Sequence, residues 1–121
     1  MKKVLVVDDS ETIRLEVGRT LEQAGFSVLE ARDGLEGLTT AGKNTDLSLL
    51  VLDVNMPVMN GLDMLERLKQ NPETAAIPVL LLTTEAEEAL IERAKKAGAK
   101  GWLIKPVKPE MLLMATNKLA R

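Results

Sequence analysis

Three residue types that carry much of protein chemistry are missing from this sequence, which has no cysteine, no histidine and no tyrosine. The absence of cysteine excludes disulfides and thiolate chemistry. The absence of histidine excludes imidazole as a base, a nucleophile or a metal ligand. Any catalysis by this chain must therefore use carboxylates, hydroxyls or amines.

Strong charge of one sign and long apolar runs are also lacking. The formal net charge of −2 argues against a nucleic-acid surface, for which a basic face would be expected. Met1-Lys2-Lys3 leads into a short apolar run that ends at Asp8, so no signal peptide is predicted, and no run approaches membrane-spanning length. We therefore expect a cytoplasmic protein without membrane contact, and a single domain over residues 1–121 with no output domain beside it.

The sequence does contain short apolar runs that alternate with segments of helical periodicity. The runs 49–52 and 79–82 are apolar at every position, as expected for parallel strands buried on both faces. Asn60 can cap a helix, and Gly98 can end one. Strands are expected at 4–7, 26–31, 47–53, 79–82 and 101–105, and helices at 10–24, 34–43, from 62 to before Pro72, 86–97 and 109–119.

This alternation predicts the α/β fold class, as a doubly wound (βα)5 sandwich around a five-stranded parallel sheet. Right-handed crossovers leave few topologies, and we choose the strand order 2-1-3-4-5, which is flavodoxin-like. Ligands of such sheets bind outside the carboxyl ends of the strands. The functional site is therefore expected at that edge.

Acidic residues follow two strands that this order makes neighbours. Asp8 and Asp9 follow the first strand, and Asp53 ends the third. Two charges about 4 Å apart at an effective dielectric near 20 repel by roughly 4 kcal/mol. Either one acid is protonated with a raised pKa, or a hard cation binds. The all-oxygen donor set favours Mg²⁺.

A metal in this pocket would attract a phosphoryl oxygen that the acids alone would repel. With histidine, cysteine and tyrosine absent, Asp53 is the best nucleophile, and its product would be an acyl phosphate. Thr83 can donate its hydroxyl to the phosphoryl group, and Lys105 can place an ammonium beside it. Acids, a hydroxyl and an amine at four strand ends together predict a metal-assisted phosphoryl site.

The whole chain resembles the receiver domain of two-component response regulators, of the free-standing chemotaxis (CheY-like) type. The motifs that carry this resemblance are Asp8-Asp9, Asp53-x-x-Met56-Pro57-x-x-Asn60-Gly61, Thr83 and Lys105-Pro106. The resemblance implies a flavodoxin-like fold. It also implies a signalling protein that is no enzyme beyond its own phosphorylation and dephosphorylation.

The resemblance also implies roles for single residues. Asp53 would accept a phosphoryl group from a histidine kinase or a histidine phosphotransfer domain. Asp9 and Asp53 would bind Mg²⁺ with the Asn55 backbone carbonyl, and Asp8 would help through water. Thr83 and Lys105 would hold the phosphoryl group. The bond between Lys105 and Pro106 is typically cis in this family.

Other implied roles concern regulation and partners. Asn55 and Glu85 occupy positions that tune hydrolysis of the acyl phosphate, although loop polarity and first-turn helix charge explain them equally well. Trp102 occupies the place of the switch aromatic, commonly Tyr or Phe, and a partly buried packing role is the alternative. The expected partners are the kinase, a downstream target such as the flagellar motor switch, and a phosphatase. We expect a monomer.

The last helix, 109–119, carries more apolar surface than one buried stripe needs, which fits either a Met-rich partner face or wider core burial.

Three rival functions share parts of this pattern. A haloacid-dehalogenase-type phosphatase also uses a strand-end Asp and Mg²⁺, but it needs a second Asp where this chain has Asn55. A flavodoxin-like flavin binder would need a phosphate loop where Asp8 and Asp9 stand. A receiver-like adaptor that binds partners without phosphorylation would not need the complete acceptor set.

Overall fold

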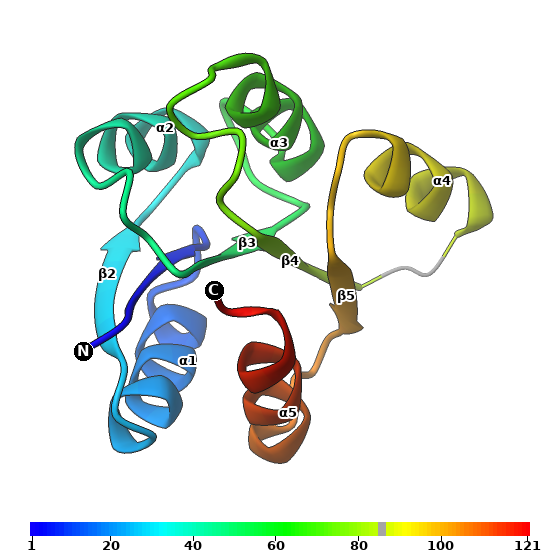
Figure 1. The fold of residues 1–121 in the computed structure, drawn as a ribbon. Coiled ribbons are helices and arrows are strands. Elements are labelled where there is room, and N and C mark those ends of the chain that lie inside the picture. Colours follow the sequence, from blue (N-terminus) through cyan, green and yellow to red (C-terminus); the bar gives the residue numbers. More distant parts are fainter. Residues whose placement is uncertain (85–86) are drawn as a thin grey trace.

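The fold is that of a five-stranded parallel sheet between two layers of helices. The computed structural model describes residues 1–84 and 87–121. The strands are β1 (Lys3–Val7), β2 (Ser27–Ala31), β3 (Leu49–Asp53), β4 (Val79–Thr83) and β5 (Gly101–Ile104), and they pair in the order β2-β1-β3-β4-β5 (Figure 1). The predicted fold class and strand order are confirmed.

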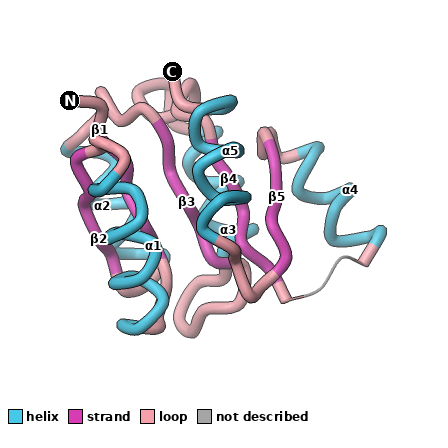
Figure 2. Tube along the Cα trace, turned by 90° about the horizontal axis from the view of Figure 1, so that it is seen from below, coloured by secondary structure: helices cyan, strands magenta, loops and turns pink. Residues whose placement is uncertain are grey.

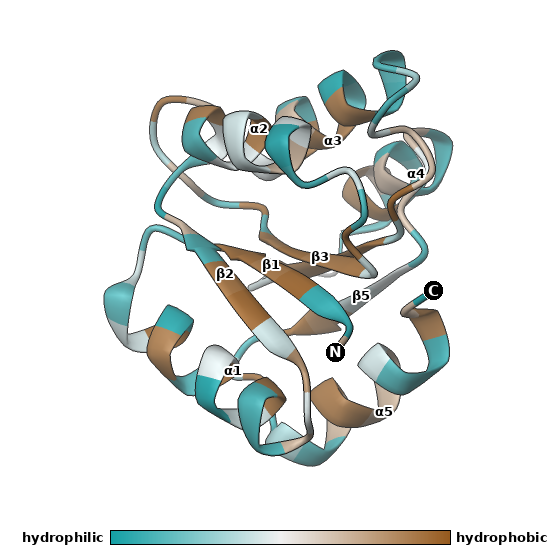
Figure 3. Cartoon of the chain, turned by 60° about the vertical axis from the view of Figure 1, so that its left-hand side comes forward, coloured by the Kyte–Doolittle hydropathy of each residue, from teal (hydrophilic) through white to brown (hydrophobic). Residues whose placement is uncertain are grey.

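Each strand except the last is followed by a helix that leads to the next strand, and a fifth helix ends the chain. These are α1 (Glu11–Gln23), α2 (Gly34–Lys43), α3 (Gly61–Gln70), α4 (Glu88–Lys96) and α5 (Pro109–Leu119). Helices α1 and α5 cover one face of the sheet, and α2, α3 and α4 cover the other (Figure 3). Both termini lie at the end of the sheet opposite the carboxyl ends of the strands (Figure 2).

The unbroken apolar runs have a direct structural reason. Because helices cover both faces, alternate residues of one strand enter two different cores. Leu50 and Leu52 belong to the core under α2, α3 and α4, whereas Leu49 and Val51 belong to the core under α1 and α5. Every residue of β3 and β4 is buried.

Short polar side chains start the helices as the sequence indicates. Ser10 caps α1, since its hydroxyl accepts a hydrogen bond from the Ile13 N–H at 3.3 Å. Asn60 caps α3 by accepting from the Asp63 N–H at 2.9 Å. These two caps fix the starts of α1 and α3, the helices that follow β1 and β3 in the chain, and so help to position the site.

The boundaries of several elements differ from the predicted ones. Strand β3 begins at Leu49 and not at residue 47. Leu47 is buried but ends a turn, because its N–H donates to the Asn44 carbonyl at 3.1 Å. Strand β2 begins one residue late, and β5 ends at Ile104. The predicted start of the fourth helix, residue 86, lies outside the described residues. Within the described part of the chain, we find no helix with the length and apolar character that a bilayer crossing requires.

Gly61 allows α3 to begin against the end of β3. Its N–H donates to the Val54 carbonyl at 2.9 Å, and a Cβ at this position would overlap the backbone carbonyl of Asp53. We predict that Gly61→Ala lowers the free energy of unfolding by about 3 kcal/mol, because the backbone at the site must move.

Gly42→Ala is the matched control, since a Cβ at this helical position meets no atom within 4 Å. It should raise stability by about 0.5–1 kcal/mol, as Ala does in a helix. Urea unfolding of both variants measures the two effects, and equal changes would contradict the steric explanation.

Candidate functional site

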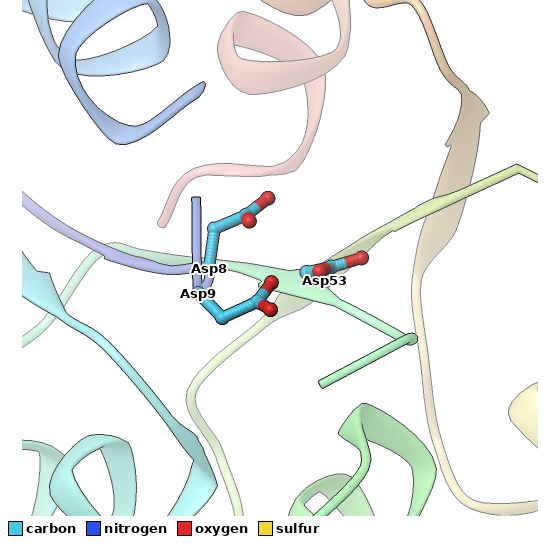
Figure 4. A group of neighbouring side chains, drawn as sticks. All are labelled: Asp8, Asp9 and Asp53. Carbon is cyan, nitrogen blue, oxygen red and sulfur yellow. The ribbon is translucent and has the colours of Figure 1, made fainter. Parts of the chain in front are cut away.

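Three carboxylates meet at the carboxyl edge of the sheet. Asp8 and Asp9 follow β1 directly, and Asp53 is the last residue of the adjacent strand β3. Each of the three offers a carboxylate oxygen, and these oxygens all lie within 4.8 Å of one another (Figure 4). Asp8 and Asp53 are buried, whereas Asp9 is exposed. The predicted convergence of the three acids is confirmed.

Lys105 supplies the positive charge that this group needs. Its Nζ atom lies 2.9 Å from Asp53 Oδ1 and 3.2 Å from Asp8 Oδ2. The peptide bond from Lys105 to Pro106 is cis, as the resemblance implied. The sequence predicted Lys105 at the site, but the prediction named only a cation or a proton as what offsets the repulsion between the carboxylates. In the structure the lysine ammonium relieves part of it.

Burial and charge change the pKa values at the site. Burial raises the pKa of Asp53 to about 6, and the negative charge of Asp8 adds to the rise, although the hydrogen bond from Lys105 opposes it. For Lys105, burial lowers the pKa, but the hydrogen bonds and charges of Asp53 and Asp8 together outweigh burial, so its pKa lies above the ordinary value. At neutral pH the site therefore contains an ionised Asp53 held next to an ammonium.

Backbone groups fix the two buried acids. Asp8 Oδ1 accepts from the Ser10 N–H at 2.9 Å. Asp53 Oδ1 accepts from the Asn55 N–H at 3.2 Å as well as from Lys105. Among the described residues these are the hydrogen bonds that the Asp53 carboxylate accepts, and both end on Oδ1. The second oxygen, Oδ2, can therefore bind a cation or attack a phosphorus atom.

Thr83 lies beside Asp53 at the same edge. It is the buried last residue of β4, and the preceding residue, Leu82, pairs with Asp53 across the sheet. Its backbone carbonyl accepts from the Lys105 N–H at 2.8 Å. The structure thus brings together Asp8, Asp9, Asp53, Thr83 and Lys105 at one edge, where the sequence predicted them.

The residues proposed to modulate the site lie around it. The Asn55 side chain is exposed, and its Nδ2 donates to Thr84 Oγ1 at 3.2 Å, a partner that motif analysis did not single out. Glu85 lies outside the described residues. Trp102 is partly buried against the core under α2, α3 and α4, and the Lys95 ammonium is 5.5 Å from its ring centroid. The role of Trp102 as a switch stays a prediction.

The donor set fits a hard divalent cation. Carboxylate oxygens are the ligands that Mg²⁺ and Ca²⁺ prefer, and Asp8, Asp9 and Asp53 each offer one. The three acids carry more negative charge than the single Lys105 ammonium offsets, so the pocket still attracts a cation. Arg14, which sequence reasoning also missed, donates to the Asp8 carbonyl at 2.7 Å.

The raised pKa of Asp53 makes a prediction about stability. Because the folded state holds this proton more tightly than the unfolded state, with pKa values of about 6 and 3.8, stability is lost as pH rises through this interval. A shift of this size corresponds to about 3 kcal/mol at neutral pH. Asp53→Asn should therefore be about as stable as wild type near pH 4 and more stable by an amount of that order at pH 7.

Urea unfolding between pH 4 and pH 7 measures this difference. Asp46→Asn is the control, because the hydrogen bond from Lys3 holds the pKa of Asp46 below its ordinary value instead of raising it. The gap between Asp46→Asn and wild type should stay constant between pH 5 and pH 7. An equally constant gap for Asp53→Asn would mean that the pKa of Asp53 is not raised.

Comparisons with known proteins agree with this geometry. The family model described as response regulator receiver domain matches residues 4–117. The chain is 40% identical over 111 residues to chemotaxis protein CheY1 of Helicobacter pylori, covering 91% of this chain and 90% of that protein. It is 36% identical over 117 residues to protein PilH of Pseudomonas aeruginosa, covering 97% and 96%.

Solved structures show the same similarity. Chemotaxis protein CheY4 of Vibrio cholerae, crystallised at low pH, superposes with a TM-score of 0.93 at 41% sequence identity, and the match covers 98% of each chain. Family, sequence relatives and fold agree over almost the whole length of the chain. The chain therefore belongs to the family of response regulator receiver domains.

Proposed function

We propose that this protein is a response regulator that accepts a phosphoryl group on Asp53 and signals through phosphorylation-dependent protein binding. The observation that carries the proposal is the contact of the Lys105 ammonium with Asp53 and Asp8 in a pocket of three carboxylates. The phosphoryl donor is a histidine kinase or a histidine phosphotransfer domain. The absence of histidine from this chain agrees with a donor imidazole on another protein.

The metal in this proposal is Mg²⁺. Asp9 and Asp53 would bind it together with the Asn55 backbone carbonyl, and Asp8 would contribute through water. When bound, the ion neutralises charge on the acids and on the phosphoryl oxygens. Lys105 then has a second task, since its ammonium can pair with a phosphoryl oxygen as well as with Asp53.

The transfer step uses the free oxygen of Asp53. Oδ2 forms a bond to phosphorus while the bond from phosphorus to the donor imidazole nitrogen breaks, and the electron pair of that bond returns to the nitrogen. The Lys105 ammonium compensates the negative charge of the transferred group. The Thr83 hydroxyl donates to another phosphoryl oxygen. The protein in this account catalyses only its own phosphorylation and dephosphorylation.

The signalling partners are those of a chemotaxis pathway in this proposal, which rests on the similarity to chemotaxis proteins. A downstream target, such as a flagellar motor switch, would bind the phosphorylated form, and a phosphatase would reset it. Met111 and Met114 of α5 are exposed while Leu112 is buried, so this helix offers flexible apolar side chains to a target. In this proposal the protein is monomeric and lies in the cytoplasm.

Three further residues would adjust this cycle. Asn55 and its partner Thr84 lie on the loops that follow β3 and β4, where they can limit the access of water to the acyl phosphate. Glu85 would act on the same hydrolysis step. Trp102 would transmit the change at Thr83 to the surface near β5 and α5.

The experiment that tests the proposal is intact-mass spectrometry after incubation with a small acyl-phosphate donor, with and without Mg²⁺. Wild type should gain one labile phosphoryl group only when the metal is present. Asp53→Asn should gain none, because the nucleophilic oxygen is lost. Asp63→Asn is the matched control, since it changes an acid that lies on α3 outside the carboxylate group, and it should be modified like wild type.

The outcomes separate the proposal from its rivals. Modification that persists in Asp53→Asn would assign the phosphoryl group to another residue and contradict the proposal. Failure of wild type to be modified, under conditions that modify a known receiver, would favour an adaptor that acts without phosphorylation. Turnover of phosphate esters would favour a phosphatase of the haloacid-dehalogenase type.

A further inference from the structure

Arg14 connects three elements next to the acid pocket, although it belongs to none of the receiver-domain motifs. It lies in the first turns of α1, and its side chain is only 11% exposed. Its Nη1 atom donates to the Asp8 backbone carbonyl at 2.7 Å, and its Nε atom donates to Glu30 Oε1 at 3.1 Å. The rigid guanidinium therefore ties α1 to the ends of β1 and β2.

The Asp8 carbonyl belongs to the peptide unit that joins Asp8 to Asp9. Because a peptide unit is planar, a short bond to its oxygen fixes the plane, and with it the direction in which the chain enters Asp9. The bond from Arg14 thus acts on Asp9 through the backbone.

The two acids differ in how they are held. Asp8 is fixed at its remaining polar atoms: its N–H donates to the Ala31 carbonyl at 3.2 Å, Oδ1 accepts from Ser10, and Oδ2 accepts from Lys105. Asp9 is exposed, and none of the described residues hydrogen-bonds to its carboxylate. The direction of the Asp9 side chain therefore depends on the backbone that carries it.

We propose that Arg14 is a positioning residue that aims the Asp9 carboxylate at the cation site by holding the peptide between Asp8 and Asp9. This inference rests on the Mg²⁺ site of the proposed function. Groups that do not bind the metal but orient its ligands typically lower metal affinity by about 10- to 100-fold when they are removed. An effect near the lower end is expected here, because Asp8 and Asp53 are held by other bonds.

The charge of Arg14 would act in the opposite direction. A guanidinium near a cation site repels the cation, so its removal would tighten Mg²⁺ binding if charge were its only contribution. Glu30 lies 3.1 Å from Arg14 Nε and offsets part of that charge. Positioning predicts weaker binding after removal, and charge alone predicts tighter binding, so the sign of the change separates the two.

Calorimetric titration with Mg²⁺, in the absence of any phosphoryl donor, measures this sign. We expect Arg14→Met to weaken Mg²⁺ binding by about 10-fold. Arg14→Lys keeps the charge but replaces the guanidinium, which donates to two acceptors, with a single ammonium. It should also weaken Mg²⁺ binding, but less than Arg14→Met does. Arg32→Met is the matched control, because Arg32 is exposed, pairs with Glu36 at 3.2 Å and carries the same charge. It should bind Mg²⁺ within twofold of wild type.

A failure of the Arg14 inference can be told apart from misfolding of a variant and from a failure of the proposed function. Urea unfolding establishes that each variant is folded, and Arg14→Lys carries the test if Arg14→Met does not fold. Unchanged or tighter Mg²⁺ binding by the folded Arg14 variants would overturn the inference. Equal weakening of Mg²⁺ binding in Arg32→Met would also overturn it, as would a wild type that binds no Mg²⁺. A wild type that binds Mg²⁺ but is not phosphorylated would contradict the proposed function and leave this test valid.

Discussion

The ionic contact of Lys105 with Asp53 and Asp8 is the interaction on which the site depends. Two buried carboxylates at the ends of adjacent strands repel each other, and one ammonium between them, at 2.9 and 3.2 Å, allows both to stay at the end of the sheet. The compensation is incomplete, because three carboxylates face one lysine, and the pKa of Asp53 stays raised at about 6. Repulsion between the carboxylates therefore remains in the pocket. A divalent cation can relieve this repulsion, and the pocket can then bind a phosphoryl group.

The rest of the fold serves to keep this edge in place. The parallel strands β1, β3, β4 and β5 end side by side, so their last residues reach one another without long loops. Ser10 and Asn60 cap the helices that follow β1 and β3, and Gly61 lets α3 begin against the Asp53 carbonyl. Rigid elements thus hold the acids, while the exposed side chains of Asn55 and Thr84 lie on loops at the rim.

Much of this arrangement could be predicted from the sequence, for physical reasons that are local. Residues 49–52 are all apolar and Asp53 follows them, which indicates a strand buried on both faces with an acid at its end. Parallel strands then bring the ends together, whatever the details of packing. The contacts that could not be predicted depend on side-chain directions between distant residues. Nothing near Arg14 in the sequence indicates that its guanidinium reaches both the Asp8 carbonyl and Glu30, and Leu47 is as apolar as a strand residue although it lies in a turn.

The most direct test of the electrostatic account is the pKa of Asp53 itself, measured by carboxyl carbon NMR during a pH titration of the wild type and of Lys105→Met. The account predicts a pKa near 6 in the wild type without metal, a higher value in Lys105→Met because the opposing ammonium is gone, and a fall when Mg²⁺ is added. An Asp53 that titrates near the ordinary value of 3.8 and does not respond to the loss of Lys105 would contradict it.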